Sequence, residues 1–196
     1  KETKEIVGEE NVLDIFFRPY TRKMWNKEIE QLSPDIVNRV PVRDDLNDLY
    51  FPNDKYQALP KNGYNFMIKN IFDHPRIEIK LSTAINFEKL AQYDFDHAFL
   101  SVPIDEFFNY KFGELPYRSI KFEHQKVNVP ILFPVTTVNF THDGPKTRIT
   151  EWKNLPNQKC KNLLHTVITT EEPCDFKDNN NERYYPVKDV SGSNLE

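Results

Sequence analysis

Glycine is scarce in this sequence, and its five copies stand far apart: Gly8, Gly63, Gly113, Gly144 and Gly192. Neither GxGxxG nor GxxxxGK[ST] can be built from residues so widely spaced. Loops of those two kinds hold the phosphates of dinucleotides and triphosphates through backbone N–H groups. The sequence therefore excludes a glycine-rich phosphate loop, and we expect neither a dinucleotide nor a triphosphate to bind this chain through one.

The sequence has only two cysteines, and it lacks the Cys and His spacings that are typical of metal sites. Cys160 and Cys174 have no CxxC or Cys/His spacing, which excludes a zinc motif and a disulfide framework and favours a reduced, cytosolic protein. The histidines show no HxxxH pair, so neither metal nor nucleophilic catalysis is supported. No apolar run approaches the roughly 18 residues of a membrane helix, and no signal-peptide pattern is seen. The sequence predicts no membrane segment.

An excess of basic charge is missing as well. The formal net charge is -4 with both signs mixed, which argues against a general nucleic-acid binder. The 196 residues, 38% of them hydrophobic, suffice for one large domain or two small ones with a core. Because the chain begins at Lys1 without a methionine, we expect it to be a piece of a longer protein.

Hydrophobic patterning changes along the chain, from a helical period to a period of two. The first helical segment should end before Pro19, and a break is expected at Ser33-Pro34. The predicted helices cover 2–18, 23–38 and 63–72, and the predicted strands cover 76–82, 97–102, 119–129, 137–143, 147–152 and 164–170. We predict an α+β fold.

This pattern also predicts a division of the chain into two subdomains. Residues 1–75 would form a helical subdomain that includes a loop at 39–45, which the family resemblance given below implies to be mobile. Residues 76–196 would form a mainly antiparallel sheet with one inserted helix at 104–113.

The stretch FFRPYTRKMW, residues 16–25, combines four aromatic residues with three basic ones. Flat rings and cations this close together suit a planar, anionic ligand such as a nucleotide. They also suit an aromatic core segment. Composition alone leaves both readings open.

Three arginines and several tyrosines lie in turn-rich surroundings. Arg39, Arg118 and Arg148 each offer a planar fork that can grip phosphate oxygens through two hydrogen bonds. Tyr50 and Tyr184 combine apolar contact with a hydroxyl that can reach phosphate or sugar. Read one by one, such arginines are more often solvated surface residues and such tyrosines are more often core residues.

Taken in order, these segments resemble the UDP-galactopyranose mutase family over nearly the whole chain. The segment FFRPYTRKMW is similar to a phenylalanine-rich run into YTxKQW, and PIDEFFNYKFGELPYRSIKFE is similar to PIDxYFxxxFGxLPYRSLxFE. The other resembling segments are NRVPVR to RxPxR, LYFPNDKYQALPKNGY to YFxDxYQxxPxxGY, VNFTHDGPKTRITEWK to VNYTxxxxPxTRxxExKH, and ERYYPV to PYYPV. One departure is Asn154, where the family usually has histidine.

The resemblance implies an isomerase that interconverts UDP-galactopyranose and UDP-galactofuranose with reduced FAD, as in cell-wall or lipopolysaccharide biosynthesis. It implies that three aromatic rings flank the uracil, those of Phe16, Phe17 and Tyr20. Thr21 and Trp25 would line the channel for the nucleotide and sugar, and the hydroxyls of Tyr50 and Tyr184 would lie beside the diphosphate. Arg39 and Arg148 would hold the diphosphate, and Arg118 would lie near the flavin. UDP or UDP-galactose would be the ligand, and a homodimer would be compatible with the resemblance.

The family's amino-terminal FAD fingerprint and its carboxy-terminal segment are missing from this sequence. We therefore interpret the chain as the middle of such an enzyme, inactive alone, whose partner is the FAD-binding domain of the same parent chain. Two alternatives remain. One is a non-enzymatic nucleotide-sugar or glycan-binding module with the same pocket, and the other is a related flavoprotein that acts on a different sugar nucleotide.

Overall fold

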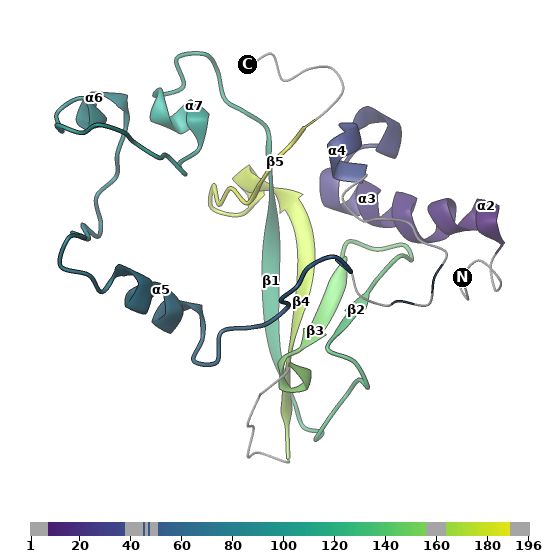
Figure 1. Ribbon diagram of the computed structural model, residues 1–196. Coiled ribbons are helices and arrows are strands. Elements are labelled where there is room, and N and C mark those ends of the chain that lie inside the picture. Colours follow the sequence, from purple (N-terminus) through teal and green to yellow (C-terminus); the bar gives the residue numbers. More distant parts are fainter. Residues whose placement is uncertain (1–7, 38–44, 46, 48–50, 156–163, 189–196) are drawn as a thin grey trace. The chain divides into compact units, whose positions relative to one another are not determined.

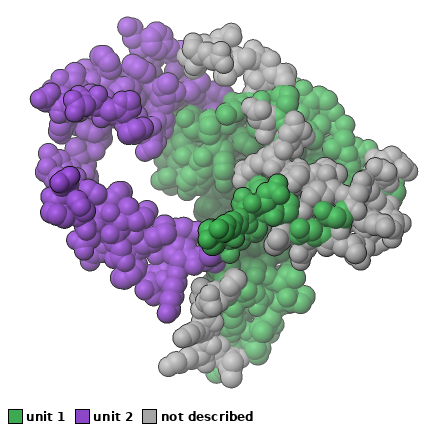
Figure 2. Space-filling model, viewed as in Figure 1, with its two compact units in different colours: residues 1–57, 117–196 green, residues 58–116 purple. Residues whose placement is uncertain are grey.

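The computed structural model describes residues 8–37, 45, 47, 51–155 and 164–188. It forms two compact units (Figure 2): unit 1 is residues 1–57 with 117–196, and unit 2 is residues 58–116. Each unit is described by itself below. The functional division expected at residue 75 remains a prediction.

The amino-terminal part of unit 1 is helical across Pro19. Helix α2 (Glu9–Val12) runs into a π-helix (Leu13–Phe17) and then into α3 (Arg18–Trp25), as Figure 1 shows. The prediction that the helix ends before Pro19 was wrong. Pro19 is the second residue of α3, directly after the π-helix, and its fixed φ is compatible with a helix. The helix ends instead at Asn26, which adopts a left-handed conformation with φ 53°.

Two short elements follow α3. A 3₁₀ helix covers Ile29–Gln31, and α4 covers Pro34–Val37. The expected break at Ser33-Pro34 is confirmed, because α4 begins at the proline.

The carboxy-terminal part of unit 1 is one antiparallel sheet with the strand order β2-β3-β4-β1-β5. The strands are β1 (Tyr117–Val127), β2 (Thr137–Asn139), β3 (Arg148–Glu151), β4 (Thr166–Asp175) and β5 (Tyr185–Pro186). Strands expected at 119–129, 137–143, 147–152 and 164–170 are confirmed with shifted ends. Helices and an antiparallel sheet together confirm the α+β class.

The strand register decides which side chains share a face of this sheet. Glu171 of β4 lies opposite Phe122 of β1 and Arg148 of β3, so these three project from one face. The neighbouring positions Ile149 and Ile168 are buried, and they project from the other face. Contacts from α3 to Arg118 and Arg148 place this helix on the face that carries Arg148.

Unit 2 holds three helices and no strand among its residues, all of which the structure describes: α5 (Tyr64–Phe72), α6 (Phe87–Leu90) and α7 (Ile104–Phe107). The strands predicted at 76–82 and 97–102 were wrong for this chain. A strand needs a hydrogen-bonded neighbour, and unit 2 supplies none, so Leu81 and Phe99 are 82% and 93% exposed.

The inserted helix of unit 2 is shorter than the expected 104–113. Asn109 and Tyr110 both adopt left-handed conformations, with φ 53° and 57°, directly after α7. Such residues cannot continue a right-handed helix. Among all described residues, no helix is long and apolar enough to cross a membrane.

Candidate functional site

Helix α3 meets strand β3 at a hydrogen bond between two residues that the sequence singled out. The Nη2 of Arg148 donates to the hydroxyl of Tyr20 at 2.8 Å, across 128 positions of sequence. Tyr20 of the aromatic stretch therefore lies against the arginine of PKTRITE, and these residues together are the candidate site.

Glu171 is a functional candidate that the sequence reasoning missed. Its Oε2 lies 3.2 Å from the Nε of Arg148, and its side chain is only 15% exposed. Burial raises the pKa of Glu171 above its ordinary value, although Arg148 opposes this shift. Glu171 is found only because β3 pairs with β4 and places it opposite Arg148. The two residues are far apart in the sequence, so no local pattern links them.

The guanidinium of Arg148 keeps hydrogen-bonding capacity. Burial tends to lower its pKa, but Tyr20 and Glu171 outweigh this and raise the pKa of Arg148 above its ordinary value. The contact to Glu171 lacks hydrogen-bond geometry, and Nε is itself buried, so this donor faces Glu171 and is not open to a ligand. The side chain as a whole is 38% exposed and charged, and it is this exposed part that is suited to an anion.

Trp25, at the end of α3, packs against a tyrosine of β5. Its ring meets that of Tyr185 edge to face, with centroids 6.2 Å apart and planes at 74°. The predicted Tyr184 instead faces Phe122, with centroids 6.2 Å apart. Both members of the YYP segment therefore contact aromatic rings, and Tyr185 is the one that contacts a predicted site residue.

The other predicted substrate residues have differing surroundings. Phe16 and Phe17 belong to the π-helix, where the wider turn changes which side chains align along the helix. Phe16 is 38% exposed, while Phe17 and Thr21 are half-buried. Arg39 and Tyr50 lie outside the described residues.

Arg118 holds the end of α3. Its Nε donates to the carbonyl of Met24 at 2.9 Å, and its Nη2 donates to that of Lys23 at 3.3 Å. A cation at a helix carboxyl end satisfies carbonyl groups and complements the helix dipole. The role of Arg118 as a cofactor contact stays a prediction.

The sequence has no glycine-rich fingerprint, and the predicted cofactor residue Arg118 uses two donors to cap α3. Within the described ranges, no group of His, Cys, Asp or Glu could hold a metal ion either.

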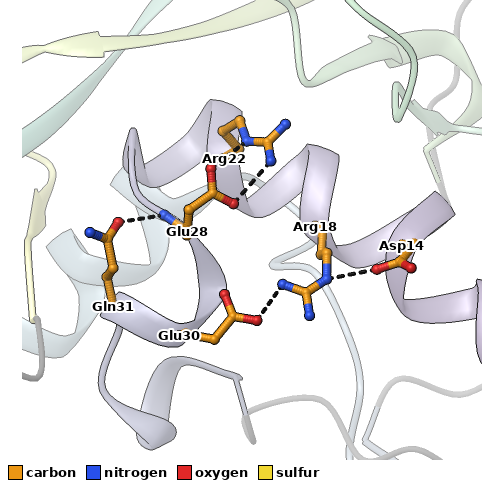
Figure 3. Close-up of polar contacts among 6 residues, drawn as sticks. All are labelled: Asp14, Arg18, Arg22, Glu28, Glu30 and Gln31. Carbon is orange, nitrogen blue, oxygen red and sulfur yellow. Dashed lines mark hydrogen bonds and ion pairs between the residues drawn. The ribbon is translucent and has the colours of Figure 1, made fainter.

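The arginines of FFRPYTRKMW are used within the chain, as Figure 3 shows. Arg18 bonds Asp14 at 2.7 Å and Glu30 at 2.5 Å. Arg22 forms two hydrogen bonds with Glu28, at 2.8 and 3.0 Å. These exposed pairs connect α3 to its neighbours in sequence, so Arg18 and Arg22 are already paired with carboxylates.

Comparisons with known proteins show the family to which the chain is similar. A family model described as UDP-galactopyranose mutase matches residues 15–195. The chain is 32% identical to a dTDP-fucopyranose mutase of Escherichia coli, over 97% of this chain and 51% of the relative. It is 32% identical to a UDP-galactopyranose mutase of Mycoplasma pneumoniae, over 91% and 47%, and 38% identical to a probable one of Klebsiella pneumoniae, over 75% and 37%.

This chain spans about half the length, or less, of these curated relatives. The match of the family model covers most of its residues and includes every residue of the candidate site. The chain belongs to the UDP-galactopyranose mutase family.

Proposed function

We propose that this chain is the substrate-binding region of a flavin-dependent UDP-galactopyranose mutase, an isomerase that interconverts UDP-galactopyranose and UDP-galactofuranose. The observation that carries the proposal is the contact of Arg148 with Tyr20. It joins an aromatic wall to a half-buried cation, and a nucleoside diphosphate needs both.

The residues divide the work between the base and the diphosphate. Phe16, Phe17 and Tyr20 flank the uracil, and Thr21 and Trp25 line the channel towards the sugar. The diphosphate is gripped by two guanidinium groups with tyrosine hydroxyls beside them: Arg39 and Arg148, Tyr50 and Tyr184. When the anomeric bond breaks, UDP gains negative charge. A guanidinium placed there stabilises that charge more in the transition state than in the ground state.

The flavin is supplied by another part of the parent protein, since this sequence carries no glycine-rich fingerprint for it. FAD contributes the covalent chemistry at the sugar, and this chain contributes binding and orientation. The chain alone is therefore inactive, and Arg118 approaches the flavin only in the complete protein.

Unit 2 supports a partner of this kind. Many of its large apolar side chains are exposed, among them Leu81, Phe99 and Phe112 at 82%, 93% and 69%. An apolar surface of this kind marks an interaction site. We propose that the FAD-binding domain of the same parent chain covers it.

We expect Leu81, Phe99 and Phe112 to become protected in the complete polypeptide. Hydroxyl-radical footprinting of the isolated chain and of the complete protein should show at least a several-fold drop in labelling at these residues. Lys55 and Tyr56 of unit 1 serve as exposed references within the same samples. Equal labelling in both proteins would contradict the proposed partner.

UDP should change the fluorescence of Trp25, because this ring lies at the edge of the site while Trp152 follows β3 at 44% exposure. In the complete protein we expect saturable quenching or enhancement on titration with UDP. Trp25→Phe should abolish most of the response, and the matched Trp152→Phe should preserve it. A Trp25→Phe protein with the full signal would place the nucleotide elsewhere.

Glu171 predicts a pH dependence of binding. Its pKa is already raised by burial, and a diphosphate beside Arg148 would raise the pKa further by repulsion. Binding of UDP would then be accompanied by uptake of a proton by Glu171. The affinity for UDP should therefore increase as the pH falls through the pKa that Glu171 has in the complex.

Glu171→Gln removes this titration and should give tight, pH-independent binding of UDP. The matched control is Glu172→Gln, since the adjacent side chain projects from the opposite face of β4. Calorimetric titration between about pH 5 and pH 8 measures both the affinity and the proton uptake. An unchanged pH profile in Glu171→Gln would show that Glu171 does not sense the ligand.

A second substrate is favoured by one observation. The E. coli relative that is similar over 97% of this chain is a dTDP-fucopyranose mutase. A pocket that flanks the base with rings distinguishes uracil from thymine by a single methyl group, which is worth only about 1–3 kcal/mol. Competition between UDP-galactose and dTDP-fucose for the complete protein decides between these substrates, and absence of turnover with either favours the non-enzymatic binding module.

A further inference from the structure

Lys23 reaches from α3 to the turn between β2 and β3. Its Nζ donates to the carbonyl of Phe140 at 3.0 Å and to that of Lys146 at 3.1 Å, across more than 110 positions of sequence. Phe140 follows β2 and Lys146 precedes β3, so one ammonium group joins both arms of the turn. The arms are also joined by a hydrogen bond from the N–H of Phe140 to the carbonyl of Thr147 at 2.8 Å.

The same turn is held from its other side by β4. The N–H of Thr147 donates to the carbonyl of Glu171 at 2.9 Å, and Thr147 is only 1% exposed. Lys146 pairs with Glu123 of β1 at 2.8 Å. The residues just before Arg148 are therefore fixed by the sheet on one side and by Lys23 on the other.

Lys23 and Tyr20 are three residues apart on α3, so they lie on the same side of the helix. One bonds the turn that leads into Arg148, and the other bonds Arg148 itself. Burial lowers the pKa of Lys23, and only Asp143 opposes this. An ammonium group can stay charged when half-buried if carbonyl oxygens replace the water molecules that it loses. The N–H donors of lysine point in different directions, so they suit two separate carbonyls better than the planar guanidinium of arginine does.

We infer that Lys23 is a positioning residue of the nucleotide site. By fastening the β2–β3 turn to α3, it keeps the guanidinium of Arg148 beside Tyr20, where the diphosphate is held. This inference rests on the proposed function, because it assigns Lys23 a role in that same site.

The competing explanation is that Lys23 only stabilises the fold. A thermodynamic cycle separates the two roles, since a residue that acts through Arg148 has no further effect once Arg148 is removed. In the complete polypeptide, we would measure UDP affinity in Lys23→Met, in Arg148→Ala and in the double variant. The matched control is Arg22→Met, which removes one positive charge from the same helix at a side chain that is 61% exposed.

We expect Lys23→Met to weaken UDP binding about tenfold, because small misplacements of a gripping group are costly. Arg22→Met should stay within about twofold of the parent, and Lys23→Met should change nothing further in the Arg148→Ala background. Amide hydrogen exchange of residues 140–147 should accelerate in Lys23→Met and not in Arg22→Met. Lys23→Arg should restore binding only in part.

Two results would overturn this inference. Equal losses of UDP affinity with and without Arg148 would show that Lys23 acts independently of it. Unchanged affinity and exchange in Lys23→Met would show that the contact has no role in the site. A parent protein that fails to bind UDP would instead reject the proposed function, and this inference with it.

Discussion

Arg148→Ala in the complete polypeptide is expected to lower turnover roughly a hundredfold, corresponding to about 3 kcal/mol of lost transition-state stabilisation. The structure gives the reason. Arg148 has a charged guanidinium that is 38% exposed, and its Nη2 donates to the hydroxyl of Tyr20 at 2.8 Å. In the proposed reaction the diphosphate gains charge as the anomeric bond breaks, so a guanidinium beside it acts most strongly in the transition state.

Removal of Arg148 also leaves the half-buried Glu171 without its cation. Arg148→Ala should therefore lose stability as well as activity. The double variant Arg148→Ala/Glu171→Gln restores stability without restoring turnover, so comparison of its melting temperature and rate separates the two effects.

Two further variants sharpen this measurement. Arg148→Lys should recover only part of the rate, because a point charge cannot reproduce the two-pronged grip. Arg22→Ala is the matched surface control, and we expect it to keep the parent's rate. Turnover of Arg148→Ala within about twofold of the parent would reduce Arg148 to a structural arginine. Steady-state turnover of UDP-galactopyranose provides the readout.

Arg39→Ala offers a complementary test of the diphosphate site. Arg39 belongs to the loop expected at 39–45, so its loss should cut turnover by about the same hundredfold with little change in melting temperature. An unfolded Arg39→Ala protein would contradict the role of this loop. Steady-state turnover of UDP-galactopyranose and the melting temperature are again the two measurements.

The sequence correctly predicted those elements that depend on interactions between residues close together in the chain. The break at Ser33-Pro34 and helix α5 follow from backbone restriction and helical period, and both are found. The strand signals at 76–82 and 97–102 were equally clear in the sequence, yet these residues pair with nothing in unit 2. A strand pattern specifies an extended, half-buried segment, but its hydrogen bonds depend on a neighbour that need not be close in sequence.

The candidate site shows the same limit. The resemblance selected Tyr20, Trp25 and Arg148, and the structure brings Tyr20 and Arg148 together. It did not select Glu171 or Tyr185, whose positions depend on the pairing of β4 with β3 and of β5 with β1. Charge patterning was also misleading locally. The arginines of FFRPYTRKMW appeared suited to an anionic ligand, but Arg18 and Arg22 pair with nearby carboxylates.

Strand β3 also ends in a fully buried carboxylate that no segment of sequence marked as structural. Glu151 is 0% exposed, and it accepts hydrogen bonds from the backbone N–H groups of Leu132 at 3.0 Å and Phe133 at 2.7 Å. The amide of Asn154 donates to the same carboxylate at 3.2 Å and to the carbonyl of Phe133 at 2.8 Å. Asn154 therefore helps to hold the segment that connects β1 with β2.

These contacts give Glu151 a defined pH dependence. Burial favours its neutral form, but the hydrogen bonds from the backbone N–H groups of Phe133 and Leu132 favour the charged form, and the pKa of Glu151 lies below its ordinary value. An acid with a lower pKa in the folded than in the unfolded protein binds fewer protons when folded. Its stabilisation is therefore complete above the unfolded pKa of about 4.3, and it is lost as the pH falls through the folded pKa.

Glu151→Gln is expected to destabilise the protein by about 3 kcal/mol at neutral pH, because the new amide NH₂ faces groups that can only donate. For a domain of this size, that corresponds to a fall of about 6–12 °C in melting temperature. Thermal unfolding between about pH 3 and pH 7 should also show a weaker acid dependence than in the parent. The control is Glu123→Gln, the same change at a carboxylate of β1 that is 69% exposed, and it should cost less than about 1 kcal/mol. If both variants melted alike, Glu151 would not hold the segment between β1 and β2, and the stability of this part of unit 1 would have to come from its apolar contacts.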